Sequence, residues 1–133
     1  MCGPGDPNSL QTILIGGKSL DHISSLALDK SGNLFASGYT SSVDFPLKNP
    51  LQPRFGGDVD AFLTKVRISD WRLLFSSYLG GSKMDGAYAV AVDSAGNPIV
   101  SGVTDSVDFA TTPFAFQPHP RGATRLVVSG SLA

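Results

Sequence analysis

The sequence predicts an all-β protein built from four-stranded antiparallel sheets that follow one another along the chain. The first observation is an internal repeat, because residues 10–45 match residues 74–109 at 15 of 36 positions when the chain is shifted by 64 residues. The second is that short apolar runs alternate with turns rich in Gly, Asn and Asp, without the periodicity of an amphipathic helix. Repeats of this size are typical of architectures in which each unit buries its apolar face against a neighbour.

The expected strands fill two units of four. The leading run Gln11–Ile15 corresponds to the fourth strand of the unit that follows it. Numbered by position within a four-stranded unit, the predicted strands along the chain are therefore strand 4, then strands 1 to 4, then strands 1 to 3. In chain order the expected strands are Gln11–Ile15, Ser24–Leu28, Leu34–Thr40, Ala61–Val66, Leu73–Leu79, Ala87–Val92, Ile99–Thr104 and Leu126–Ser129.

Tight hairpin turns are expected at equivalent places in the two repeats. Asp suits the first position of such a turn, Gly takes the positive φ, and Asn tolerates the neighbouring position. The turn residues are Asp29, Gly32 and Asn33 in the first repeat, and Asp93, Gly96 and Asn97 in the second. A second pair of turns sets a carboxylate beside an aromatic ring, and this pattern favours a hydrogen-bonded cap with a buried ring rather than a contact with a ligand. These pairs are Asp44 with Phe45 and Asp108 with Phe109.

The long connection of residues 41–60 contains Pro46, Pro50 and Pro53, followed by Gly56-Gly57. This composition favours an irregular excursion between antiparallel strands over a helical crossover. Each period therefore contains four strands joined without a helix. Four-stranded antiparallel units in tandem are the pattern of β-propeller blades.

The same residues carry a likeness to a known family. Glycines, acids and aromatic residues agree with its pattern across several strands and turns, roughly from Leu10 to Gln117. The matching segments are Gly80-Gly81-x-x-x-Asp85-x-Ala87-x-Ala89-Val90-Ala91-Val92-Asp93-Ser94-Ala95-Gly96-Asn97, Ser101-Gly102-x-Thr104-x-Ser106-x-Asp108-Phe109, Asp58-x-Asp60-Ala61-Phe62-Leu63-x-Lys65 and Leu74-x-Ser76-x-Tyr78-Leu79-Gly80-Gly81. The chain thus resembles the bacterial SBBP beta-propeller repeat. The resemblance implies a bladed module of large secreted or cell-surface proteins, with no enzyme activity and no cofactor.

The second repeat departs from this pattern. Pro46 is replaced by Ala110, and the acids at positions 58 and 60 are replaced by Ala123 and Arg125. The second unit is therefore expected to end in a degenerate or truncated blade. We divide the chain into a tail (1–9), a first repeat (10–73) and a second repeat (74–133).

Two blades cannot close a propeller, which typically takes about four to eight. An isolated pair of blades would leave two apolar faces in water, so other blades are the expected partners. They would come from a longer chain or from identical copies. Three or four copies would supply about six or eight blades, with Gln11–Ile15 completing a blade of a neighbouring copy or of its own chain.

Composition narrows the function further. The 133 residues carry a net charge of −1, and the ten Lys and Arg residues form no stripe of the kind that binds nucleic acid. Cys2 is the only cysteine, which excludes an intrachain disulfide and a cysteine-based zinc site. The start of the chain has no signal-peptide pattern, and no apolar run is long enough to insert into a membrane. Export is therefore expected from the family resemblance alone.

Few residues are candidates for chemistry. His22 and His119 occupy unequal places in the repeat and lack partners for a metal. Asp58 and Asp60 are weak candidates for a cation or an acid/base pair. The aromatic residues with potential stacking surface for a sugar are Trp71, Tyr78 and Tyr88.

Three functions follow. The first is a non-catalytic extracellular scaffold or binding domain, whose rim loops contact a protein or a glycan. The second is a lectin-like ring of identical chains. The third is a fragment of a larger propeller enzyme whose catalytic residues lie in other blades.

Overall fold

The computed structural model describes residues 10–109 and 125–130, and these form strands and loops without a helix. The strands are β1 (Asp21–Leu28), β2 (Asn33–Thr40), β3 (Asp60–Arg67), β4 (Arg72–Leu79), β5 (Asp85–Val92), β6 (Pro98–Thr104) and β7 (Arg125–Gly130). The predicted all-β class is confirmed, and no described segment has the helical length and apolar character that a membrane crossing requires.

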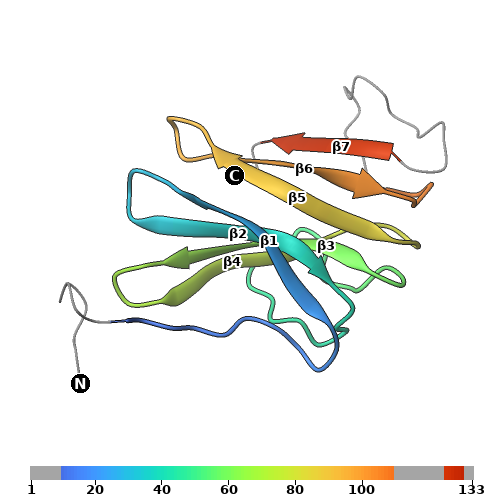
Figure 1. Cartoon of the computed structure of the whole chain (residues 1–133), viewed down its shortest axis with the longest axis horizontal. Coiled ribbons are helices and arrows are strands. Elements are labelled where there is room, and N and C mark those ends of the chain that lie inside the picture. Colours follow the sequence, from blue (N-terminus) through green and yellow to red (C-terminus); the bar gives the residue numbers. More distant parts are fainter. Residues whose placement is uncertain (1–9, 110–124, 131–133) are drawn as a thin grey trace.

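The strands form two antiparallel sheets that lie one on the other (Figure 1). Sheet 1 has the order β1-β2-β3-β4, and sheet 2 has the order β5-β6-β7. Strand β5 crosses β1, β2 and β3, so it joins the two sheets. Within each sheet every strand pairs with the next strand along the chain, as expected from the hairpin turns and the prolines of the 41–60 connection.

Sheet 1 packs against other parts of the chain on both of its faces, but to different extents. We call the side on which sheet 2 packs its stacked face; here Phe35, Leu63 and Phe75 meet Val90 and Val100. The other side, the open face, is covered at one end only, where the 41–59 connection packs its apolar side chains. That second cluster contains Phe45, Phe62 and Tyr78, flanked by Ile15, Leu47 and Phe55.

The two hairpin turns have the same geometry. The Asp29 carboxylate accepts hydrogen bonds from the backbone N–H of Ser31 at 2.8 Å and of Asn33 at 2.9 Å, and Gly32 has a φ of 83°. Asp93 and Gly96 repeat this arrangement, with a φ of 87° at the glycine. Because left-handed φ values strain residues with a side chain, Gly at this position fixes where each hairpin turns.

The first strand of each sheet contains a bulge opposite a glycine of the second strand. In sheet 1 the register shifts between Ile23 and Ser25, opposite Gly38, and in sheet 2 between Ala87 and Ala89, opposite Gly102. A Cβ on Gly38 would overlap the backbone carbonyl of His22. The close approach of the bulged strand therefore requires glycine.

One expected strand is absent. Residues 10–20 run past the open face of sheet 1 without pairing in a sheet, so the prediction of a strand at Gln11–Ile15 is wrong. Within the described residues this segment has no strand edge beside it, whereas its counterpart β4 pairs with β3. A strand needs a partner for its backbone hydrogen bonds, and here the partner edge is missing.

Candidate functional site

The most elaborate polar arrangement in the described residues is the corner where β4 passes into β5. Asp85 opens β5 and is fully buried. Its carboxylate accepts hydrogen bonds from the Gly81 N–H at 2.8 Å, from the Ser106 hydroxyl at 3.0 Å and from the Thr104 hydroxyl. One carboxylate thus ties the incoming loop to the end of β6.

The same corner precedes β1. Asp21 accepts hydrogen bonds from the Gly17 N–H at 3.0 Å, from the Thr40 hydroxyl at 2.6 Å and from the Ser42 hydroxyl at 3.0 Å. Each predicted turn acid adds a hydrogen bond to the loop that leads into the corner. Asp44 accepts from the Lys18 N–H at 2.9 Å, and Asp108 accepts from the Ser82 N–H at 2.8 Å; this second bond lowers the pKa of Asp108. The repeat therefore preserves a three-dimensional junction as well as a sequence pattern.

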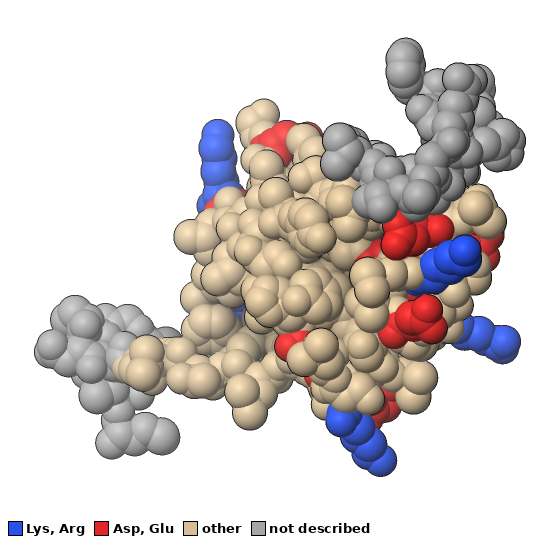
Figure 2. All heavy atoms as spheres, turned by 45° about the vertical axis from the view of Figure 1, so that its right-hand side comes forward, with Lys and Arg blue, Asp and Glu red and all other residues tan. Residues whose placement is uncertain are grey.

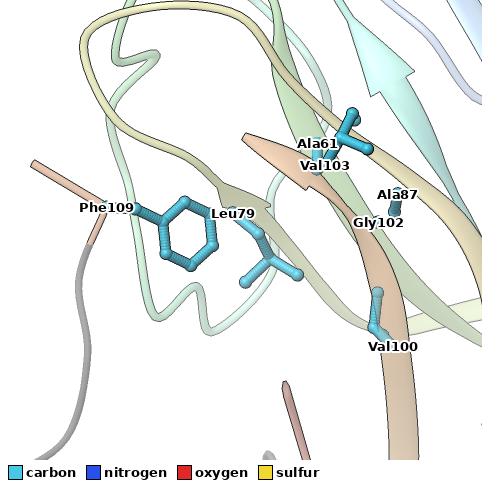
Figure 3. Close-up of a pocket in the computed structure, with 8 residues that line it drawn as sticks. Ala61, Leu79, Ala87, Val100, Gly102, Val103 and Phe109 are labelled. Atoms are coloured by element: carbon cyan, nitrogen blue, oxygen red, sulfur yellow. The ribbon is translucent and has the colours of Figure 1, made fainter. Parts of the chain in front are cut away.

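The aromatic partners of these acids have different surroundings. Phe45 is buried among Phe62 and Tyr78, with ring centroids 4.6 Å and 6.1 Å away. Phe109 is half-buried and lies beside Leu79 at the edge of the core between the sheets (Figure 3). The hollow there has a volume of about 10 Å³, which is too small for an organic ligand.

The corner between β4 and β5 contains a second acid. Asp60 opens β3 and is fully buried; its Oδ2 accepts hydrogen bonds from the Gly56 N–H at 2.7 Å and from the Gln52 side-chain amide at 2.9 Å. Its Oδ1 has no hydrogen-bond partner. A Cβ on Gly80 would contact both Asp60 and Asp85, which places the two carboxyl groups around this glycine.

Burial, followed by the charge of Asp85, raises the pKa of Asp60 to about 6. Below that pH Asp60 is neutral, and its proton can be held between the two carboxyl groups. This is an arrangement for holding one proton inside the fold. Neither acid is among the residues that line the hollow beside Phe109.

Asp58 does not join Asp60. Asp58 is exposed, whereas Asp60 is buried, and the described residues contain no group of three potential metal ligands among His, Cys, Asp and Glu. Spacing along the chain suggested the pair 58 and 60, but tertiary structure pairs Asp60 with Asp85 instead. The sequence feature that could have indicated this pair is that Asp60 and Asp85 each begin a strand, one before and one after Gly80-Gly81.

The three aromatic candidates lie apart from one another. Tyr78 is fully buried; its hydroxyl donates to the Ser42 carbonyl at 2.7 Å and accepts from the Phe45 N–H at 3.3 Å, so no ring surface is left for a ligand. Tyr88 is 58% exposed at the bulge of β5. Trp71 is half-buried in the β3–β4 hairpin with a φ of 56°.

Trp71 borders a groove of about 250 Å³ on the open face of sheet 1. The residues around it are mostly apolar: Thr12, Ile13, Ile15, Ile23, Leu26, Leu34, Ala36, Val66 and Trp71, with Gln11. Figure 1 shows the segment before β1 running along this side of sheet 1, away from β5. An exposed apolar surface of this kind is typical of a contact with another macromolecule.

The face seen in Figure 2 has no patch of a single charge. In the view of Figure 2 acidic and basic side chains are interspersed toward the rim, while the middle of the face is neutral. Arg67 and Asp70 form an exposed ion pair at 2.8 Å in the β3–β4 hairpin. The apolar groove is therefore the leading candidate for an interaction surface.

Comparison of the sequence with protein-family models and with curated proteins finds no match.

Proposed function

We propose that the chain is a non-catalytic β-propeller repeat module that acts as an extracellular scaffold or binding domain. Its two sheets would be consecutive blades, either within a longer propeller or as the unit of an oligomeric one. The resemblance to SBBP repeats supports both the bladed architecture and the location outside a bacterial cell.

The observation that carries this proposal is the way in which the sheets stack. Sheet 2 packs on sheet 1 through Ala87, Val90 and Val100, whose equivalents in the first repeat lie on the open face of sheet 1. The face of sheet 1 that receives sheet 2 therefore corresponds to the outer face of sheet 2, which could receive a further unit in the same way. Stacking of this kind continues from unit to unit, which is the arrangement of repeat proteins and of propeller blades.

Binding would take place through the loops at the ends of the strands, because the sheet faces are used for stacking. The hairpin turns after β1, β3 and β5 lie at one end, and the corner loops lie at the other. The corner loops are held by buried carboxylates, whereas the hairpin turns are exposed. We assign partner binding to the hairpin end.

Tandem fusion tests the bladed architecture. Proteins that contain one to four copies of residues 10–133 in a single chain would be compared by thermal unfolding and by sedimentation. We expect the three-copy or four-copy protein to be a compact monomer with a markedly higher unfolding temperature, because no blade face remains in water. An unfolding temperature that does not depend on copy number, measured where the single-copy protein sediments as a monomer, would refute the proposal.

A glycan-binding ring is the second candidate, and the Trp71 backbone favours it. A bulky residue at positive φ is uncommon and strained, and such strain gathers at functional sites. Glycan-array binding by the chain, lost in Trp71→Ala and kept in Tyr88→Ala, would support a sugar site at the groove. Absence of binding to every glycan on the array counts against it.

A further inference from the structure

Within the described residues, two sheet faces have no further sheet packed on them, and each is the repeat equivalent of a face that is buried between the sheets. The first is the open face of sheet 1. Leu26 is 58% exposed there and Ile23 is 46% exposed, whereas their equivalents Val90 and Ala87 are 8% and 1% exposed between the sheets. The same positions are therefore buried in the repeat that has a neighbour and exposed in the repeat that lacks one.

The second surface is the outer face of sheet 2. Ile99 is 41% exposed, whereas its equivalent Phe35 is 2% exposed on the stacked face of sheet 1. Ala91 is exposed as well, and its equivalent Ala27 packs against the core between the sheets. The outer face of sheet 2 thus corresponds to the surface of sheet 1 that receives a following sheet.

These two surfaces are complementary but cannot meet within one chain. The open face of sheet 1 points away from sheet 2, and the outer face of sheet 2 points away from sheet 1. They lie on opposite sides of the two-sheet stack. Only a second copy can bring one against the other, through a heterologous contact that closes into a ring when the rotation permits.

The leading segment, residues 10–15, shows the same difference in exposure between equivalent positions of the two repeats. Leu14 is 95% exposed, whereas its equivalent Tyr78 in β4 is fully buried. The corner that connects this segment to β1 already has the hydrogen bonds of the corner that connects β4 to β5. Residues 10–15 are therefore directed toward the sheet that would precede sheet 1, as β4 is directed toward β5.

An edge for that segment exists on sheet 2. Strand β7 pairs with β6 on one side, and no described segment pairs with its other side. Sheet 1 has a fourth strand, β4, at this place. Sheet 2 is thus one strand short, and the leading segment is the equivalent of that missing strand.

We infer that a second copy of this chain docks on the open face of sheet 1 through the outer face of its sheet 2. In this contact residues 10–15 of the first copy pair with β7 of the second copy and complete its sheet. The inference rests on the proposed function, and it names the partner as the chain itself.

Cross-linking between chains tests the contact. Inside the chain the Val90 N–H donates to the Ser25 hydroxyl at 3.2 Å. Since Leu26 is the equivalent of Val90, and Ala89 that of Ser25, the contact brings position 26 of one copy to position 89 of the next. In a Cys2→Ser background, L26C and A89C chains are mixed in equal amounts and treated with a short bismaleimide.

We expect a cross-linked dimer in the mixture and at least tenfold less in either variant alone. A mixture of V43C with A89C is the control, because Val43 is 78% exposed but lies in a turn outside both faces. Efficient linkage of L26C to itself would show a symmetric contact and overturn the inference. Equal linkage in the control mixture, or none in any mixture, would overturn it as well.

Disruption of the open face of sheet 1 gives an independent test of the contact between copies. Leu26→Asp replaces an exposed residue, so the variant should keep its β-sheet circular dichroism while its sedimentation changes to that of a monomer. If the tandem fusions described above form compact propellers but single chains never cross-link, the proposed function stands and this inference fails. If the fusions also behave as independent units, both fail.

Discussion

At the scale of single residues, the main finding is that the polar side chains of the repeat hold its corners together through hydrogen bonds. Asp21 and Asp85 each satisfy a backbone N–H and two hydroxyl groups. Asp85 is fully buried and Asp21 is half-buried, and carboxylates with this number of donors stabilise a structure, because removing them leaves several donors unpaired. Their spacing in the sequence therefore reflects architecture.

Asp60 predicts an unusual pH dependence. Its pKa is about 6 in the folded protein and 3.8 as the ordinary value, so between these values the folded state binds the proton more readily than the unfolded state. This group therefore stabilises the fold fully below pH 4, and its contribution is lost as the pH rises through 6. The difference corresponds to about 3 kcal/mol in the free energy of unfolding.

Asp60→Asn imitates the neutral acid at every pH. We expect urea unfolding of the variant to lose the decline between pH 4 and pH 6.5 and to show higher stability than wild type at pH 7.5. Asp58→Asn, two residues away at an exposed position, should leave the wild-type profile unchanged. The same decline in Asp60→Asn as in wild type would contradict this role.

Gly38 predicts a steric effect. Gly38→Ala places a Cβ against the His22 carbonyl, so the bulged pair of strands must move apart. We expect a loss of more than about 2 kcal/mol in the free energy of urea unfolding. Gly86→Ala, where the nearest atom to a Cβ is 3.5 Å away in the Tyr88 ring, should cost much less. Equal losses in the two variants would argue against the close approach.

At the scale of elements, the sequence predicts strands well wherever both partners lie within the chain. The seven expected strands after residue 20 are present, because apolar alternation and Asp/Gly/Asn turns fix their places. Gln11–Ile15 has the same apolar character but is not a strand, since pairing needs an edge that the described chain does not place beside it. Local pattern predicts a propensity, and a partner decides the structure.

The same limit applies to the candidate site. Residues 58 and 60 are close in sequence, but the acids that meet are Asp60 and Asp85, 25 residues apart. Only the path of β3 and β4 around Gly80 brings these two together. The hydrogen bonds of Tyr78 were likewise not predictable, because they involve the corner residues Ser42 and Phe45.

Removal of the leading segment tests its role as an element. A chain that begins at residue 16 loses the half-buried Ile13 and Ile15, so its free energy of unfolding should fall by about 1–2 kcal/mol while the sheets remain. Assembly should be lost because the shortened chain has no leading segment that could pair with β7 of a neighbouring copy. A chain that begins at residue 10 is the control and should assemble as the full chain does. Assembly by both truncated chains would show that residues 10–15 are dispensable.

At the scale of the whole molecule, two stacked sheets with complementary faces at the two ends account for the repeat, the groove and the exposed leading segment together. A chain of this kind leaves apolar sheet faces in water unless other units pack on them. Several exposed apolar side chains, Leu14 and Leu26 among them, lie where the neighbouring unit would sit.

The mass of the chain in solution tests this account most directly. Sedimentation equilibrium over a wide concentration range should give a single closed species of three or four chains, each of 13.9 kDa, with no larger forms accumulating. Leu26→Asp should give 13.9 kDa under the same conditions. A wild-type chain that stays folded and monomeric at the highest concentration, with Leu26 in water, would contradict the account.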